Sequence, residues 1–305
     1  MTLSVLTTVQ QWVLFSGTAL AVGCVAWRLF VSPGAAAELG TDGAALQAVQ
    51  RRAASIGVLT SLALILAWVL RMVVQVMGFR DPFVPLSEDV SFLLFEMFWG
   101  TVWMAQGVTL LLLVGSFVWA RSRKGEATAA WSAAGVLTLA LVATLALSSH
   151  AMGADSGRAL LVAADGVHAL AAGTWIGSLT VILLAGRPAA VGPSGAAVFV
   201  AQLRAFSPMA VVSVAALLFM GSVLAWTHLA GLANLWETSY GRILAAKIAV
   251  AGAVLLAGLW NWRRGLPSSD TPEGAVTVQH RAVVEVSLAL GVLLLTAVLV
   301  HSAKP

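Results

Sequence analysis

Charged side chains are scarce in this chain. Asp, Glu, Lys and Arg make up 10% of the residues and hydrophobic residues 60%, whereas a soluble domain of ordinary composition carries about a quarter charged residues. The apolar residues form continuous blocks of about 20 or more, long enough to cross a bilayer core roughly 30 Å thick. Continuous blocks also exclude the alternating pattern of a membrane β-barrel. We therefore expect an all-α, polytopic membrane helix bundle.

Several motifs of soluble and catalytic proteins are also missing. The single cysteine, Cys24, lies inside the first apolar block, which excludes an intrachain disulfide and a CxxC metal or redox pair. The sequence contains no P-loop, no HExxH motif and no serine-nucleophile motif. The first 27 residues hold no Lys or Arg, so the charged start of a cleavable signal peptide is absent. We expect neither an ATP-driven pump nor an enzyme.

The apolar blocks predict about eight transmembrane helices, separated by stretches rich in Gly, Pro and Ser. The predicted spans are Val9–Val31, Ala53–Gly78, Phe92–Ala120, Ala130–Ser149, Ala159–Ala185, Phe206–His228, Arg242–Trp262 and Arg281–His301.

The loops between the spans predict the orientation of the bundle. Basic residues follow spans one, three, five and seven, namely Arg51, Arg52, the "RSRK" run at 121–124, Arg187, Arg204, Arg263 and Arg264. The alternate loops carry Asp81, Glu88, Asp89, Asp155 and Glu237 instead. Because Lys and Arg mark the cytoplasmic side, both termini are predicted to lie outside. The basic residues form no continuous stripe, so the net charge of +4 does not indicate nucleic-acid binding, and the expected surroundings are membrane lipid.

A short internal repeat suggests two parallel four-helix halves. The segment "LWETSYGRILAAK" at 235–247 aligns with "LFEMFWGTVWMAQ" at 94–106, matching Leu, Glu, Gly and Ala. Both segments enter the membrane from the outside, in spans three and seven, as in transporters built from parallel repeats. We therefore predict one half at residues 1–149 and a second at 150–305.

Histidines supply the candidate functional groups. His150, His228 and His301 end spans four, six and eight at the outer surface. His168 lies about 15 Å inside span five at 1.5 Å per residue, and Asp165, three residues earlier, shares its helix face. Ionisable groups at this depth usually face a cavity or a partner, although an imidazole can also simply hydrogen-bond to a neighbouring helix.

The ligand types at the outer surface favour copper. His150 and Met152 stand two residues apart in "HAM", close enough to share one ion. Imidazole and thioether suit copper, and a thioether favours Cu(I) over harder ions. The predicted metal ligands are therefore His150, Met152, His168, His228, His301 and Asp165.

Two residue pairs predict contacts between helices. Gly173 and Gly177 form a small-xxx-small pair, which lets another helix pack close to span five near His168. Arg71 and Glu96 lie at similar depth in spans two and three, and we expect them to form a structural ion pair.

The second half of the chain resembles the copper resistance protein D (CopD) family. The resemblance is carried by Asp165, His168, Trp175 and Gly177 in one helix, by "FSPMA" at 206–210, by "TSYGRILAAK" at 238–247, and by "NWRRGLP" and "HRAVVEVSLALGVLLL". The stretches "PLSEDV" and "WGTVWMAQ" look like the first-half module of longer members. The resemblance implies copper uptake across the bacterial inner membrane, often with a periplasmic CopC-type copper-binding partner. No CopC-like domain is fused here, so such a carrier would be a separate protein.

Three functions stay open at this point. The first is copper transport, with an outer capture site leading to His168. The second is a membrane oxidoreductase with haem b held by bundle histidines. The third is a non-catalytic assembly subunit whose histidines bind nothing.

Overall fold

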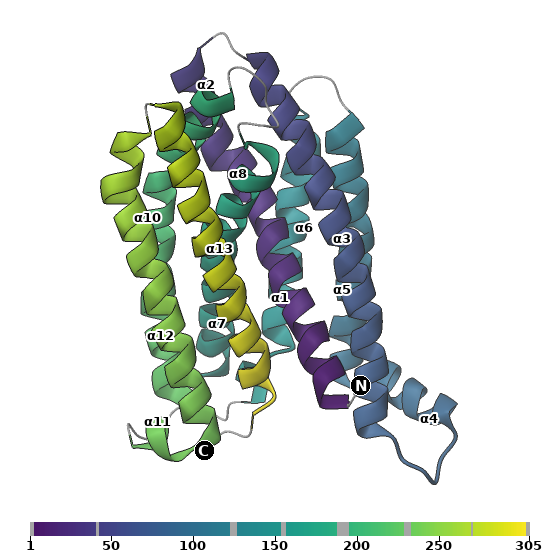
Figure 1. Ribbon diagram of the computed structural model, residues 1–305. Helices are drawn as coiled ribbons and strands as arrows, with labels where there is room; N and C mark the ends of the chain where they lie inside the picture. Colours follow the sequence, from purple (N-terminus) through teal and green to yellow (C-terminus); the bar gives the residue numbers. More distant parts are fainter. Residues whose placement is uncertain are drawn as a thin grey trace.

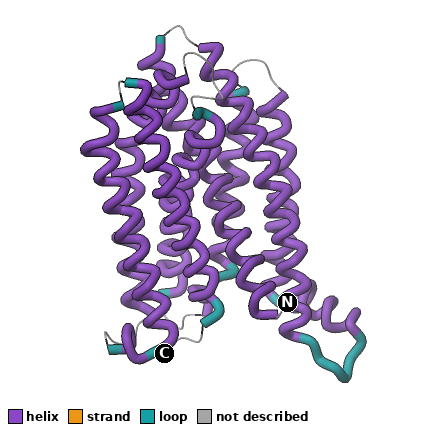
Figure 2. Tube along the Cα trace, viewed as in Figure 1, coloured by secondary structure: helices purple, strands orange, loops and turns teal. Residues whose placement is uncertain are grey.

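The computed structural model describes residues 3–40, 43–122, 127–153, 157–187, 195–228, 233–269 and 271–302. Within these ranges the side chains of residues 43, 44, 150, 151, 228 and 272 are not described. The described residues form helices joined by short connections and contain no strand (Figure 2).

The helices follow one another along the chain in a single bundle (Figure 1). The first half contains α1 (Leu3–Ala26), η1 (Trp27–Val31), α2 (Ser32–Leu39), α3 (Gly43–Phe79), α4 (Leu86–Ser91), η2 (Phe92–Glu96), α5 (Phe98–Ser122), α6 (Thr128–Leu147) and η3 (His150–Gly153). The second half contains α7 (Arg158–Ala172), η4 (Gly173–Gly177), α8 (Ser178–Ala185), α10 (Gly195–His228), α11 (Asn234–Glu237), α12 (Ser239–Trp260), η5 (Asn261–Gly265), η6 (Leu266–Ser268) and α13 (Pro272–Val300).

The eight predicted spans are confirmed, since eight helical segments among the described residues are long and apolar enough to cross a membrane. Several boundaries were wrong. The helices of spans two and eight begin at Gly43 and Pro272, ahead of the predicted Ala53 and Arg281. The helix of span six begins at Gly195, well before the predicted Phe206, and it continues through Pro208 because only one backbone N–H is lost there. Span three begins at Phe98, because the chain breaks at Met97 between η2 and α5.

The chain ends lie at one end of the bundle, together with the short helices α4 and α11, and α2 lies at the opposite end (Figure 1). The distribution of basic residues predicts that the α2 end faces the cytoplasm. There Arg204 of α10 forms an ion pair with Glu38 of α2, with 2.6 Å between Nη1 and Oε1. An exposed pair of this kind contributes about 0.2–1 kcal/mol, so it positions the α2 end more than it stabilises the fold.

Helix α1 is the centre of the bundle. It packs against α3, α6, η4, α8 and α13. In the most apolar 18-residue stretch of its span, 56% is buried inside the protein. A single hydrophobic cluster runs through it and includes Leu14, Trp27, Phe117 and Ile182, none of which is accessible to solvent. The indole of Trp27 extends the core to α10 by donating a hydrogen bond of 3.0 Å to Gln202 Oε1.

Glycine contacts between α1 and η4 fix the position of the helix that carries His168. A Cβ on Gly173 would meet the Val22 side chain, and a Cβ on Gly177 would meet the Ala19 carbonyl oxygen and Gly23. The predicted small-xxx-small pair therefore does bring another helix close, and that helix is α1. The backbone of η4 widens into π-helical turns at this contact, a feature frequently found at functional sites.

The two aligned segments break at equivalent residues. Met97 separates η2 from α5 with φ −97° and ψ 138°, and Thr238 separates α11 from α12 with φ −100° and ψ 154°. After each break a glycine, Gly100 or Gly241, touches the backbone of the preceding short helix, where a Cβ would collide. The segments thus share their local structure, and the division into halves at residue 149 stays a prediction.

Thr238 caps the helix that carries Lys247, so its loss should destabilise the outer end of α12. Its Oγ1 accepts a hydrogen bond of 2.9 Å from Gly241 N and donates one of 2.7 Å to Asn234 O. Replacing an N-cap threonine by alanine typically costs about 1 kcal/mol. We expect Thr238→Ala to lower the unfolding midpoint in detergent, and Thr238→Ser to retain it. Equal stability of both variants would contradict the capping role.

The last three spans are packed less tightly than the first five. In the most apolar 18-residue stretch of each span, 39–56% is buried inside the protein in spans one to five, but only 6%, 11% and 22% in spans six, seven and eight. Helix α10 packs against α7 and α2, whereas α12 packs mainly against α13. Helices α10 and α12 thus belong to two separate pairs, α7–α10 and α12–α13, and the polar side chains described next lie between these pairs.

Candidate functional site

His168 lies on α7, with its ring against α10. A Cβ on Gly221 of α10 would be 3.2 Å from His168 Cε1 and 3.5 Å from Nδ1, so the absence of a side chain at Gly221 makes room for the imidazole. The Leu217 carbonyl, one turn earlier on α10, is a hydrogen-bond acceptor beside the same ring, but its contact with Nδ1 lacks the geometry of a hydrogen bond. His168 Nδ1 is buried and has no hydrogen-bond partner among the described residues. Buried polar atoms are rarely left in this state, so the nitrogen is available to a ligand.

Lys247 of α12 completes a cluster of three ionisable side chains with His168 and Asp165. The ammonium group acts electrostatically on His168 and on Asp165, and all three side chains are half-buried. Asp165 and Lys247 compensate each other's charge, which a low-dielectric environment requires. The cluster offers an imidazole and a carboxylate as ligands, and it holds a positive charge that an arriving metal ion would have to displace from Asp165.

Lys247 was missed as a member of this site. The sequence analysis placed it only opposite Gln106 in the internal repeat and in the motif at 238–247. The signal was nevertheless present, because Lys247 ends the "TSYGRILAAK" motif, and a lysine in the outer half of a span needs an acidic partner.

The predicted outer ligands lie at the same end of the bundle, but the described side chains form no complete metal site there. Met152 is half-buried in η3, and His301 is exposed at the end of α13. The side chains of His150 and His228 lie outside the described part. No group of three or more His, Cys, Asp or Glu residues that could hold a metal occurs among the described residues, so the outer capture site stays a prediction.

The equivalent position in the first half is closed by aromatic side chains. Arg71 Nη1 donates a hydrogen bond of 3.3 Å to Gln106 Oε1, and its guanidinium lies 5.8 Å from the Trp99 ring centroid. The expected Arg71–Glu96 ion pair is wrong, since Glu96 is exposed and Arg71 points to Gln106 instead. Gln106 is neutral and fully buried, and its Oε1 accepts a charge-assisted hydrogen bond from Arg71. The first half therefore has a neutral residue at the position where the second half has Lys247.

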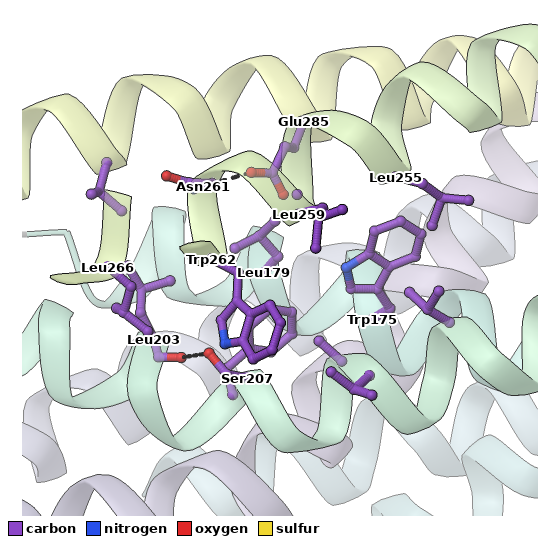
Figure 3. A pocket seen from close by; sticks show the side chains of 16 residues that line it. Trp175, Leu179, Leu203, Ser207, Leu255, Leu259, Asn261, Trp262, Leu266 and Glu285 are labelled. Carbon is purple, nitrogen blue, oxygen red and sulfur yellow. Dashed lines mark hydrogen bonds between the residues drawn. The ribbon is translucent and has the colours of Figure 1, made fainter. Parts of the chain in front are cut away.

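A cavity of about 330 Å³ lies further inward, between α8, α10, α12 and α13. Its lining is mostly apolar and includes Trp175, Leu179, Phe206, Leu255 and Trp262. Figure 3 shows the two polar side chains that meet at its edge, Asn261 and Glu285. Trp175 lies two helical turns after His168 in the chain, so the cavity begins about 10 Å inward from the imidazole.

Glu285 is a buried carboxylate that the sequence analysis did not consider. Glu285 is 4% exposed, and Asn261 Nδ2 donates a hydrogen bond of 3.0 Å to its Oε1. A single acidic residue in the last apolar block could have indicated it, because carboxylates inside a span are rare and usually functional.

These features define a class of protein: a multi-pass α-helical membrane protein that holds ionisable side chains at membrane depth between its last helices. The chain belongs to the copper resistance protein D family. Residues 1–159 match the copper resistance protein D-like, N-terminal domain, and residues 200–299 match copper resistance protein D.

A curated relative and the solved structures complete the comparison. The copper transport protein CutJ of Bacillus subtilis (strain 168) is 25% identical over 166 residues, which cover 54% of this chain and 30% of that longer protein. No solved structure matches the chain.

Proposed function

We propose that this protein transports copper ions across the bacterial inner membrane, and that His168 and Asp165 bind the ion on its way. The observation that carries the proposal is the buried His168 Nδ1, which lacks a partner and lies on the same helix face as a carboxylate. Imidazole is a good copper ligand in either oxidation state. Membership of the copper resistance protein D family and the similarity to a copper transport protein support copper as the cargo.

Lys247 would neutralise the charge of the site while no ion is bound. Its ammonium group compensates Asp165, so the empty site carries no uncompensated negative charge inside the membrane. An arriving copper ion would take over this role, and its departure would return Lys247 to Asp165. This exchange makes and breaks no covalent bond in a substrate, so the proposed role is that of a transporter and not of an enzyme.

His150, Met152, His228 and His301 would collect copper at the outer surface. All four residues belong to segments that end on the side of the chain termini. A separate periplasmic carrier of the CopC type would deliver the ion to them, and the ion would then pass between the α7–α10 and α12–α13 pairs to His168. Thioether ligands prefer Cu(I) to harder ions, and imidazole also suits copper. Such a ligand set is therefore suited to capturing copper.

The metal content of purified protein tests the proposal. Cells are grown with added copper, and elemental analysis and a visible spectrum are recorded for the wild type and for His168→Ala. We expect close to stoichiometric copper in the wild type and a clear loss in the variant. Iron with a Soret band would instead identify a haem protein. Absence of both metals would overturn the proposal in favour of a subunit whose histidines only form hydrogen bonds.

A further inference from the structure

The cavity beside Glu285 contains one titratable side chain and no compensating charge. Of its lining residues only Glu285 can ionise, and Ser207, a polar member of the lining, donates its hydroxyl to the Leu203 carbonyl of its own helix (Figure 3). Glu285 lies one helical turn inside the predicted start of span eight at Arg281, and it is 4% exposed. A carboxylate buried inside a span needs a cation, and the lining does not supply one.

The charged groups on the surrounding helices do not neutralise Glu285 either. Arg281 lies one turn away on α13 but forms no ion pair with it among the described residues. Arg263 and Arg264 of η5 and His280 of α13 are exposed, and Arg264 lies over the Trp260 ring. Arg204 of α10 pairs with Glu38, and Lys247 acts on the outer cluster. Helices α1 and α8 contain no charged residue.

The immediate contacts of Glu285 suit a carboxyl group that gains and loses a proton. Gly258 keeps space open beside it, since a Cβ there would be 3.4 Å from Glu285 Oε2 and 3.8 Å from Trp175 Cζ2. Asn261 donates to Oε1, while its own Oδ1 is buried without a partner among the described residues. Half a turn of this amide would present Oδ1 as an acceptor, so Asn261 can serve both the ionised and the protonated carboxyl.

We propose that Glu285 and Asn261 form a proton-binding site in this cavity, and that the proton taken up there is coupled to passage of the copper ion. The second clause rests on the proposed function, and the first does not. Binding converts the carboxylate to a neutral carboxylic acid with an O–H bond on Oε2, and release returns the proton to water on one side of the membrane. A carboxylate and an amide are hard oxygen ligands that suit a proton far better than Cu(I). Together they offer fewer oxygens than a bound sodium ion would need.

The location of the site explains why the two ions would be coupled. Trp175 lines the cavity and follows His168 by two turns on the α7–η4 segment, so both sites share one wall. The opposite wall is α12 with its continuation η5: α12 carries Lys247 in its outer half, and η5 begins with Asn261. Movement of α12 that releases copper from the outer cluster would also change the contact between Asn261 and Glu285.

Infrared spectroscopy of the purified protein tests the proton site without any copper. We expect the carbonyl band of a protonated carboxylic acid at neutral pH in the wild type and in Asp165→Asn, and its loss in Glu285→Gln. Gln has the same size as Glu and can still accept from Asn261, so this variant should fold, which its unfolding midpoint checks. Persistence of the band in Glu285→Gln, or its absence in the wild type, would overturn the site. Loss of the wild-type band on adding sodium would show a sodium site and would also overturn the proposal.

Copper flux into proteoliposomes tests the coupling. A pH gradient should increase copper flux by the wild type. In Glu285→Gln this increase should be about tenfold smaller, a usual size for coupling between two sites. Arg281→Gln is the matched control on the same helix and should keep the stimulation. Equal stimulation of the wild type and Glu285→Gln would contradict the coupling. Absence of copper flux in the wild type would instead contradict the proposed function, while the infrared band still decides the proton site.

Discussion

Replacing His168 by alanine is expected to lower copper accumulation by at least about 100-fold, since even the loss of an outer-sphere partner lowers metal affinity about 10–100-fold. The imidazole is the ligand of the proposed intramembrane site that suits copper best. Because Nδ1 has no partner among the described residues, its removal leaves no orphaned donor or acceptor behind. The variant should therefore stay folded and lose transport alone. Copper uptake into cells, measured per molecule of protein in the membrane, gives the result.

His280→Ala is the matched control for this experiment. His280 is an exposed histidine on α13 near the cytoplasmic end, far in sequence and along the membrane axis from the proposed site. We expect its replacement to leave accumulation unchanged. Normal accumulation in His168→Ala would rule out the proposed mechanism, and an equal loss in both variants would point to a general effect of histidine removal.

The arrangement of spans could be predicted because it depends on properties that a sequence displays directly. Burial of backbone in lipid requires helices of a minimum length. The orientation, which rests on the basic residues of alternate loops, stays a prediction. The depth of His168 followed from its distance to the end of its span. The contact of His168 with α10 could not be predicted. Gly221 makes room for the imidazole, but this matters only because α7 and α10 lie side by side.

Partners from distant spans could not be predicted. Arg71 was expected to pair with Glu96 at similar depth, but rotation around the helix axes directs it to Gln106 and Trp99. Lys247 acts on Asp165 although the two belong to spans five and seven. Depth gives one coordinate of a residue in a bundle, and the order of helices around the axis gives the other, which hydrophobic patterns do not encode.

The break at Met97 shows the same limit in the backbone. No proline or glycine stands at this residue, so a turn was not expected, and the predicted span ran on from Phe92. The signal lies three residues later, in Gly100, which lets α5 approach the backbone of η2. Glu285 was visible as a single carboxylate in an apolar block, but the cavity that surrounds it arises from four separate helices.

Replacing Gly177 by alanine is expected to cost about 3 kcal/mol of stability, the upper part of the range for overpacked cores. The added Cβ would meet the Ala19 carbonyl oxygen and Gly23, which are backbone groups that cannot move aside as a flexible side chain does. Helix α1 would have to shift away from η4, and the hydrogen bond of 3.3 Å from Ser178 Oγ to the Gly23 carbonyl would be strained. The unfolding midpoint in detergent measures the effect.

Gly115→Ala provides the matched control, because a Cβ at Gly115 of α5 would meet nothing within 4 Å. Alanine there should stabilise the helix by about 0.5–1 kcal/mol through its higher propensity. Opposite signs for the two substitutions would locate the effect in the α1–η4 contact. Because η4 continues α7, a displaced η4 would also move His168 relative to Gly221, so Gly177→Ala should weaken copper binding without touching a ligand. Wild-type stability of Gly177→Ala would mean that α1 does not hold η4 in place, and the geometry of the His168 site would then need another support.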